Sequence, residues 1–194
     1  MLKTSRRPST PSKASSLIVA IIGAGPLGRW LALAAARGGY CVLLEDVMPA
    51  NLHHAREALR RELSQAALPA VTFVSTIEDA VRDADLVIDC VPDELESKLE
   101  IFCLLDRMAP PRTILATPST RLSIADLAAC TYRADKCVAV VAEAGTLAEG
   151  TGGGLVLRIT PQTVPETVAM VREFWENLGF NPRFEMDPSL SPQS

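Results

Sequence analysis

No two of the five cysteines form a C-x-x-C pair, and the sequence has only two histidines, His53 and His54. Zinc sites and dithiol redox sites are built from such closely spaced residues, so we expect neither kind of site and no bound metal. Isolated cysteines within apolar runs behave as small hydrophobic residues. Together these features predict a reduced, cytoplasmic protein.

The sequence also lacks an uninterrupted apolar run of membrane-spanning length, which is about 20 residues. Its most apolar stretch, residues 17–36, is interrupted by Gly23, Gly25, Pro26, Gly28 and Arg29. The formal net charge of −4 at pH 7 gives no basis for binding nucleic acid or anionic lipid. We therefore expect neither a membrane segment nor a nucleic-acid partner.

Two polar segments flank a single predicted domain. Residues 1–16 carry four basic side chains among serines, threonines and prolines and contain no acid, which predicts a disordered basic tail. A targeting segment is the alternative for this composition. Residues 187–194 are rich in proline and serine and predict a second disordered tail. The folded domain is expected to cover residues 17–186.

Within that domain, apolar runs of strand length alternate with helical patterns. The expected strands are residues 17–22, 41–44, 71–74, 86–91, 113–117, 137–142 and 155–159. The expected helices are residues 26–37, 51–66, 76–82 and 94–108, then a short helix after Ser123 and one from Pro165 to Gly179. This alternation predicts a mainly parallel sheet, and the apolar strands predict helices on both faces. The expected fold is α/β, of the doubly wound Rossmann type.

Capping pairs mark where three of these helices are expected to begin. Thr76 with Asp79, Ser123 with Asp126 and Thr163 with Glu166 have capping-box spacing. Pro165 also fits the first turn of its helix, since the N–H that proline lacks has no partner there.

A Gly23-x-Gly25-x-x-Gly28 motif follows the first expected strand and opens the first expected helix. An acid, Asp46, ends the second strand about 20 residues further on, as the dinucleotide-binding fingerprint requires. Gly23 permits the tight turn, the missing side chain of Gly25 lets a pyrophosphate approach, and Gly28 allows close packing of helix on strand. We expect Pro26 and Leu27 to belong to the same binding turn.

The acid also indicates which dinucleotide is bound. The carboxylate of Asp46 can accept hydrogen bonds from ribose hydroxyls and would repel a 2′-phosphate, and no arginine follows at residues 47–50. These features favour NAD over NADP. Two alternatives remain at this point: a glycine-rich turn that binds no ligand, and a flavin site, which begins with the same motif.

Four stretches in this order resemble the NAD-binding domain of the 3-hydroxyacyl-CoA dehydrogenase family. They are residues 22–28 (IGAGPLG), 84–102 (ADLVIDCVPDELESKLEIF), 113–122 (TILATPSTRL) and 160–163 (TPQT). The resemblance covers residues 16–188. It implies an NAD-dependent oxidoreductase that acts on 3-hydroxyacyl-CoA in fatty acid metabolism.

The resemblance also implies roles for single residues. Asp93 and Lys98 match an acid and a lysine beside the NAD ribose, with Val91 at the end of the preceding strand as a further cofactor contact. Thr117 matches a serine that contacts the substrate and keeps its hydroxyl group. The structural alternatives are a helix N-cap for Asp93 and a solvent-facing position for Lys98.

The sequence departs from the family where the chemistry occurs. The family's general base is a histidine oriented by a glutamate, and Val141 and Val156 occupy these two positions. Pro118, Ala144 and Gly145 replace further family residues, an asparagine beside the serine and the Asn-Pro after the histidine. Glu143 is a candidate substitute base, and a solvated loop acid is its alternative. His53 and His54 are expected at the surface, near the adenosine end. These replacements predict impaired catalysis, because a general base contributes about 10²–10⁴ in rate.

The chain also stops where the family's helical C-terminal domain would begin, and that domain helps to hold the acyl-CoA and to form the dimer. We expect an exposed apolar surface around Val168, Val171 and Trp175, which would favour self-association or a partner chain. Two functions therefore stay open: an oxidoreductase of this family, and a non-catalytic NAD-sensing or partner-docking module. A degenerate remnant without a role is a third possibility.

Overall fold

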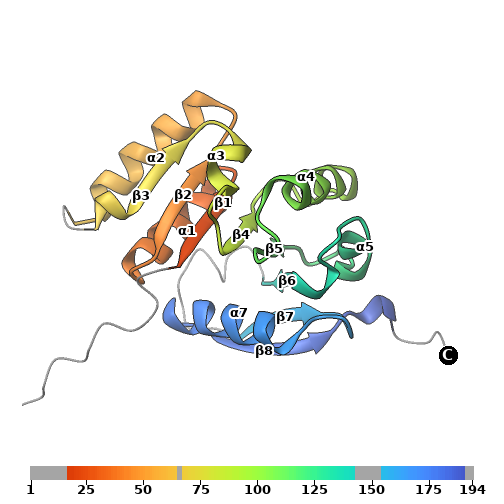
Figure 1. The fold of residues 1–194 in the computed structure, drawn as a ribbon. Coiled ribbons are helices and arrows are strands. Elements are labelled where there is room, and N and C mark those ends of the chain that lie inside the picture. The colour runs from red at the N-terminus through yellow and green to blue at the C-terminus, as the bar shows by residue number, and fades with distance from the viewer. Residues whose placement is uncertain (1–16, 65–66, 143–153, 191–194) are drawn as a thin grey trace, which may run out of the picture.

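A computed structural model of the chain describes residues 17–64, 67–142 and 154–190. One eight-stranded sheet with the order β3-β2-β1-β4-β5-β6-β7-β8 forms its centre (Figure 1). The strands are β1 (Ile18–Ile22), β2 (Cys41–Glu45), β3 (Val71–Val74), β4 (Leu86–Asp89), β5 (Ile114–Pro118), β6 (Cys137–Val141), β7 (Gly154–Ile159) and β8 (Asn181–Met186). The helices are α1 (Pro26–Arg37), α2 (Pro49–Glu62), α3 (Ile77–Val81), α4 (Leu95–Met108), α5 (Ile124–Ala129) and α7 (Pro165–Asn177). Short 3-10 turns are η2 (Leu68–Ala70), η3 (Ala134–Lys136) and η4 (Pro188–Leu190).

Every neighbouring pair of strands is parallel except β6 and β7, which are antiparallel. From β1 the chain first builds outward through β2 and β3, then returns and continues from β4 on the other side of β1. This reversal is the topological switch point of a doubly wound sheet, where dinucleotides bind at the carboxyl ends of the strands. The predicted Rossmann-type fold is confirmed.

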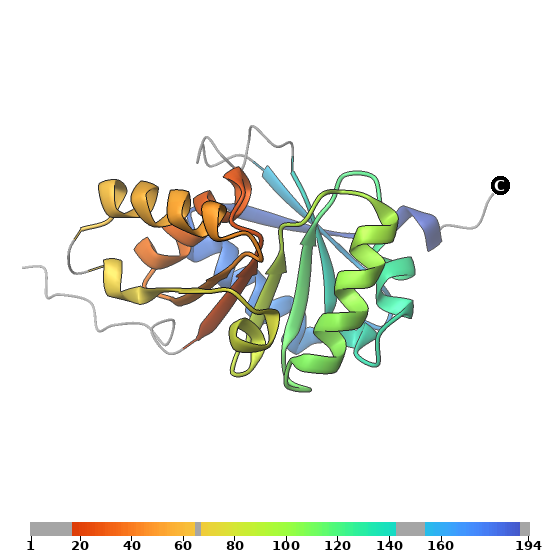
Figure 2. The same cartoon turned by 90° about the horizontal axis from the view of Figure 1, so that it is seen from above.

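Two hydrophobic clusters cover the two faces of the sheet. One cluster joins α1, α2 and α7 to the face that carries Val19 and Ile21. The other joins α3, α4 and α5 to the face that carries Ala20 and Ile22. Successive residues of a strand point to opposite faces, so a continuous apolar run supplies both clusters. Seen from above, the strands fan out as the sheet twists between these helices (Figure 2).

Two of the three predicted helix caps are confirmed. The hydroxyl groups of Thr76 and Ser123 accept from the N–H groups of Asp79 and Asp126, each at 3.2 Å. The third is wrong, because the N-cap of α7 is Val164 and its side chain makes no capping bond. The Thr163 hydroxyl instead accepts from the Thr160 N–H at 3.0 Å and closes the preceding turn.

The predicted apolar surface on α7 is also wrong. Val171 and Trp175 are 0% and 1% exposed, and Val168 is half-buried. Trp175 packs edge-on against Phe180, with ring centroids 5.5 Å apart, within the cluster that covers this face of the sheet. Because α7 docks on its own domain, these residues give no support to self-association.

The C-terminal part holds one strand that the sequence pattern did not predict. β8 pairs in parallel with β7 and forms an edge of the sheet, where Pro182 is tolerated because no strand follows to receive its missing N–H bond. The structure also continues past the expected end of the domain at residue 186. Asp187 is 2% exposed, and its carboxylate accepts from Ala125 N–H at 2.9 Å and Ser123 Oγ at 3.0 Å.

None of the helices within the described part of the chain has the length and apolar character needed to cross a membrane.

Candidate dinucleotide site

The glycine motif forms a tight turn between β1 and α1. Gly23 has φ +101°, a conformation that favours glycine, and its N–H donates to the main-chain oxygen of Glu45 at 2.8 Å. A Cβ at Gly28 would lie 1.8 Å from the oxygen of Gly23, so no larger residue fits while the helix stays in place. A Cβ at Gly25 would meet no protein atom within 4 Å. Gly28 is thus required for packing, whereas Gly25 leaves open space above the turn.

The N-terminus of α1 faces that open space. Gly25 is the N-cap of the helix, Pro26 follows as its first residue, and the first turn contains no acid. The first amides of a helix lack partners within it and carry about half a positive charge. An anionic group above Gly25 would therefore be stabilised by the helix, which is how such turns bind pyrophosphate.

Asp46 connects this turn to the end of β2. Its Oδ2 accepts from the Ala24 N–H and its Oδ1 from the Met48 N–H, each at 2.8 Å. The side-chain amide of Asn51 donates to both oxygens, at 3.2 and 3.1 Å. The carboxylate is 8% exposed and already holds the shape of the turn, so its position is fixed before any ligand arrives.

Two cavities lie on either side of the end of β4 and share Cys90 and Val91 in their walls. The first, of about 480 Å³, is lined by the glycine turn, the end of β2 and apolar side chains of α3 and α4: Gly23, Gly25, Pro26, Glu45, Asp46, Val47, Asn51, Ile77 and Ile101 among others. The second, of about 270 Å³, is lined by Leu27, Asp93, Pro118, Ser119, Thr120 and Ala142 in addition to the shared pair. The switch point between β1 and β4 thus has a hollow on each side, as a two-part ligand requires.

Asp93 projects into the second cavity with an unsatisfied oxygen. Its Oδ1 is buried and has no hydrogen-bond partner among the described residues, while Arg121 Nη2 donates to its main-chain oxygen at 2.9 Å. The N-cap of α4 is Glu94, so the alternative of Asp93 as a helix cap is wrong. A buried acceptor without a partner is costly, and a ligand hydroxyl in this cavity would satisfy it.

Lys98 and Thr117 meet at a residue that the sequence interpretation missed. The carboxylate of Asp89, at the end of β4, accepts from Lys98 Nζ and Thr117 Oγ1, each at 3.0 Å, and from the Val91 N–H at 2.9 Å. All three side chains are 0–1% exposed. Burial raises the pKa of Asp89, and the ammonium group of Lys98 opposes that rise.

This buried trio shows that the alternative of a solvent-facing Lys98 is wrong, and it shows where the hydroxyl of Thr117 lies. Lys98 does not face solvent, and it lines neither cavity because its ammonium group is turned to Asp89 beneath the loop. The hydroxyl of Thr117 is likewise bound to Asp89 and fully buried, so it does not point at a substrate in this structure. Both residues support the loop after β4, whose residues form the walls of the two cavities.

The two positions that the resemblance assigns to the family's catalytic pair lie opposite each other and are apolar. Val141 at the end of β6 is the direct cross-strand partner of Val156 on β7. Glu143, Ala144 and Gly145 lie outside the described residues. His53 and His54 are exposed on α2, which follows β2, and line neither cavity. Burial raises the pKa of the Cys90 thiol far above its usual range, so that thiol stays protonated at neutral pH.

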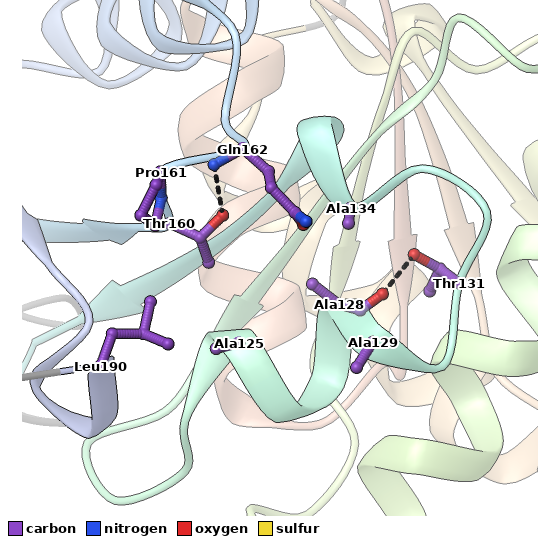
Figure 3. A pocket seen from close by; sticks show the side chains of 9 residues that line it. All are labelled: Ala125, Ala128, Ala129, Thr131, Ala134, Thr160, Pro161, Gln162 and Leu190. Carbon is purple, nitrogen blue, oxygen red and sulfur yellow. Dashed lines mark hydrogen bonds between the residues drawn. The ribbon is translucent and has the colours of Figure 1, made fainter.

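A larger hollow of about 550 Å³ lies away from the glycine turn, between α5, η3, the turn after β7 and Leu190 (Figure 3). Four of its nine lining residues are alanines, and the lining contains no ionisable side chain. Two of the hydroxyl groups within it are already occupied: Thr131 Oγ1 donates to the oxygen of Ala128 at 2.9 Å, and Thr160 Oγ1 accepts from Gln162 N–H at 3.2 Å. This surface offers little chemistry compared with the two cavities.

Sequence analysis missed three residues of the site: Glu45, Asp89 and Ser119. Ser119 lines the second cavity, and its Oγ accepts from Leu122 N–H at 2.9 Å and so shapes the loop after β5. Glu45 and Asp89 left a signal in the sequence, because each ends an apolar strand with a charged residue. A buried acid in such a place needs a partner or a ligand, which marks it for attention.

Comparisons with known proteins agree with this geometry. The family model for the NAD-binding domain of 3-hydroxyacyl-CoA dehydrogenase matches residues 18–141. The chain is 30% identical over 133 residues to a probable 3-hydroxybutyryl-CoA dehydrogenase of Bacillus subtilis, covering 62% of this chain and 46% of that protein. It is 30% identical over 182 residues to the 5-formyl-3-hydroxy-2-methylpyridine 4-carboxylate 5-dehydrogenase of Mesorhizobium japonicum, covering 84% of this chain and 55% of that protein.

Solved structures of related enzymes share this fold. The 3-hydroxyacyl-CoA dehydrogenase of Archaeoglobus fulgidus superposes with a TM-score of 0.74 at 27% identity, covering 90% of this chain and 58% of that one. A diketoreductase superposes with a TM-score of 0.77 at 30% identity, covering 87% of this chain and 64% of that one. The chain thus spans about half the length of the curated relatives that it matches. It belongs to the 3-hydroxyacyl-CoA dehydrogenase family and corresponds to that family's NAD-binding domain, with NAD rather than a flavin as the cofactor.

Proposed function

We propose that this chain binds NAD across the two cavities at the switch point and does not oxidise 3-hydroxyacyl-CoA by the family's histidine–glutamate route. One observation carries the proposal. The binding turn is complete, with Gly23, Gly25, Gly28 and Asp46 in place, whereas the paired positions of the catalytic dyad are Val141 and Val156.

The side chains of this site suit the parts of NAD. The open space at Gly25 and the N-terminus of α1 would take the pyrophosphate. Asp46 would accept hydrogen bonds from the ribose hydroxyls of adenosine, and these would replace the hydrogen bonds that the Asn51 side-chain amide now donates to it. The unpartnered Oδ1 of Asp93 would accept from a hydroxyl of the second ribose. When bound, NAD supplies a hydride acceptor at its nicotinamide ring.

The two positions that the resemblance assigns to the dyad offer no replacement for the missing base. A general base works best when its pKa lies near the working pH, which is why a histidine suits the task. Val141 and Val156 cannot accept a proton, and the thiol of Cys90 stays protonated. Without this base, hydroxyacyl oxidation would be slower by about 10²–10⁴, which equals roughly 3–5 kcal/mol of barrier.

The same pair of valines favours a second candidate, a non-catalytic module that senses NAD or docks on another protein. An intact cofactor crevice with an apolar reaction site suits such a role, and the fold alone does not decide between the two. An acyl-CoA-type ligand and a partner chain belong to this proposal as well. The named relatives include both 3-hydroxybutyryl-CoA and pyridine carboxylate dehydrogenases, so the substrate class is left open.

The experiment combines calorimetric titration of the whole chain with NAD, NADP and FAD and an assay of NADH formation from 3-hydroxybutyryl-CoA. The proposal expects binding of NAD, weaker binding of NADP and FAD, and negligible NADH formation. Turnover at rates usual for enzymes, about 1–10³ s⁻¹, would overturn the loss of the family route. A failure to bind any of the three ligands would overturn the proposal as a whole.

A further inference from the structure

Glu45, the last residue of β2, carries a carboxyl group that the proposed function does not use. The residue is 4% exposed and lines the first cavity. Its hydrogen bond to Gly23 uses the main-chain oxygen. Within residues 17–64, 67–142 and 154–190, no hydrogen bond reaches its carboxyl group. The buried side-chain atoms without a partner among the described residues do not include the Glu45 oxygens, so we infer that this carboxyl group meets the open cavity, where a ligand atom would supply its partner.

The cavity around Glu45 suits a planar ligand group with apolar faces. Leu43, two residues earlier on β2, belongs to the cluster under α3 and α4, so Glu45 faces the same side of the sheet. On that side the cavity is lined by Ile77, Val91 and Ile101. The carboxyl group of Glu45 therefore lies in a mainly apolar part of the cavity, beyond the turn that Asp46 holds.

The inference rests on the proposed function, because it concerns the adenine base of NAD, to which no residue has been assigned so far. The glycine turn suits the pyrophosphate and Asp46 suits the ribose, and neither of these groups has an apolar face. The adenine base has two apolar faces and a polar edge, which carries an amino donor beside ring-nitrogen acceptors. We propose that Glu45 reads this edge, accepting from the 6-amino group of adenine and donating to a neighbouring ring nitrogen.

Donation requires the protonated carboxyl group, and the charges around Glu45 favour that form. Burial, and secondarily the negative charge of Asp46, raise the pKa of Glu45 from 4.5 to about 7. The other ionisable residues lining the cavity are Asp46 and Cys90, and neither carries positive charge. The buried cation of α4, Lys98, is already paired with Asp89. A pyrophosphate at Gly25 would add further negative charge, so ligand binding and protonation of Glu45 support each other.

The test is a double-mutant cycle between residue and ligand. Binding of AMP and of purine riboside 5′-monophosphate, which lacks the 6-amino group, is measured by ligand-observed NMR on the whole chain and on Glu45→Leu. Both proteins should fold, because the substitution removes a buried polar group rather than a packed one. We expect Glu45→Leu to lower the affinity for AMP about tenfold and the affinity for the purine analogue about threefold or less. Glu62→Leu, an exposed glutamate of α2, is the matched control and should change neither affinity.

Two further arms separate the possible causes. Glu45→Gln keeps a donor and an acceptor, so it should retain AMP binding. The ratio of the natural chain's AMP affinity to that of Glu45→Gln should fall from pH 6 to pH 8, and this ratio cancels the titration of the AMP phosphate, which both proteins share. Nicotinamide mononucleotide, which has no adenine, should bind Glu45→Leu and the natural chain equally. An equal loss for AMP and the purine analogue, or no loss for either, would overturn the role of Glu45 alone. A natural chain that binds neither AMP nor NAD would overturn the proposed function with it.

Discussion

Val141 and Val156 stand directly opposite each other on the antiparallel strands β6 and β7. Side chains of such a pair point to the same face, with Cβ atoms about 4.5–5.5 Å apart. A histidine and a glutamate at these positions would be able to form a hydrogen bond, which is the arrangement that the family resemblance implies. If the resemblance assigns these positions correctly, the two valines together stand where the family has its complete catalytic pair.

Restoring this unit should increase turnover. Val141→His combined with Val156→Glu should raise NADH formation from 3-hydroxybutyryl-CoA by about 10²-fold or more over the natural chain, since a positioned general base contributes about 10²–10⁴. The single variants serve as controls and should gain much less, because an unoriented histidine is a poorer base. Equal rates in the natural chain and the double variant would contradict this assignment of the two positions.

Two glycines of one motif should fail in different ways. Gly28→Ala places a Cβ 1.8 Å from the Gly23 oxygen, so α1 must move and the chain should lose several kcal/mol of unfolding free energy or fail to fold. Gly25→Val adds a Cβ that meets no protein atom within 4 Å, so its free energy of unfolding should stay within about 1 kcal/mol of that of the natural chain. Calorimetry on Gly25→Val should nevertheless show NAD binding weakened at least tenfold. A Gly25→Val chain with undiminished NAD affinity would refute the position given to the pyrophosphate.

The preference for NAD over NADP should depend on the charge of Asp46. Asp46→Asn removes the negative charge and one acceptor, so NAD affinity should fall about tenfold, while the ratio of NAD to NADP affinity narrows. Calorimetric titration with both dinucleotides measures this ratio. Asp126→Asn, at an exposed acid on α5, is the matched control and should leave it unchanged. A preserved ratio in Asp46→Asn would show that another group selects the cofactor.

The buried pair of Asp89 and Lys98 should be far more important for stability than an exposed pair. Lys98→Met leaves the carboxylate of Asp89 buried without its countercharge, and urea unfolding should show a loss of about 3–5 kcal/mol. Adding Asp89→Asn should recover part of that loss. The control is Lys136→Met, which breaks a partly exposed pair with Asp135 and should cost less than about 1 kcal/mol. Similar losses in the two single variants would argue against the buried network.

Stability should decline as pH rises through the range set by Glu45. The pKa of the Glu45 carboxyl group is about 7 in the folded chain and 4.5 in the unfolded chain. The stability that this difference contributes is fully present below pH 4.5 and is lost as the pH rises through 7. The full loss is about 3 kcal/mol. Urea unfolding at pH 5, 6, 7 and 8 should show a steeper decline for the natural chain than for Glu45→Gln. Parallel profiles would contradict the raised pKa, and Glu62→Gln should follow the natural chain.

The glycine turn and Asp46 could be predicted because short stretches of sequence specify them. The turn from β1 to α1 depends on three glycines within six residues, each with a steric reason that the sequence shows directly. Asp46 follows from its place at the end of the second apolar run. The strand order and the helices on both faces follow from the alternation of apolar runs and helical patterns.

The parts that sequence reasoning missed depend on contacts between distant segments. Lys98 has the sequence pattern of a surface residue, and only the packing of α4 on β4 places it beside Asp89. Trp175 is buried because α7 docks on its own sheet rather than on another domain. β8 was missed because its alternation of Pro182 and Phe184 with polar residues is short and contains a proline. Tertiary packing thus decided the outcome wherever local preference was weak.

The most direct test of the account is a titration of the ¹⁵N-labelled chain with NAD, followed through the amide signals of the glycine turn. If the pyrophosphate lies above this turn, the signals of Gly25 and Leu27 should shift with the NAD concentration and saturate at the affinity found by calorimetry. The amide of Tyr132, which donates to the carboxylate of Asp106 and lines neither cavity, should stay in place as a reference. Binding of NAD that leaves Gly25 and Leu27 unshifted, or no binding at all, would contradict the account.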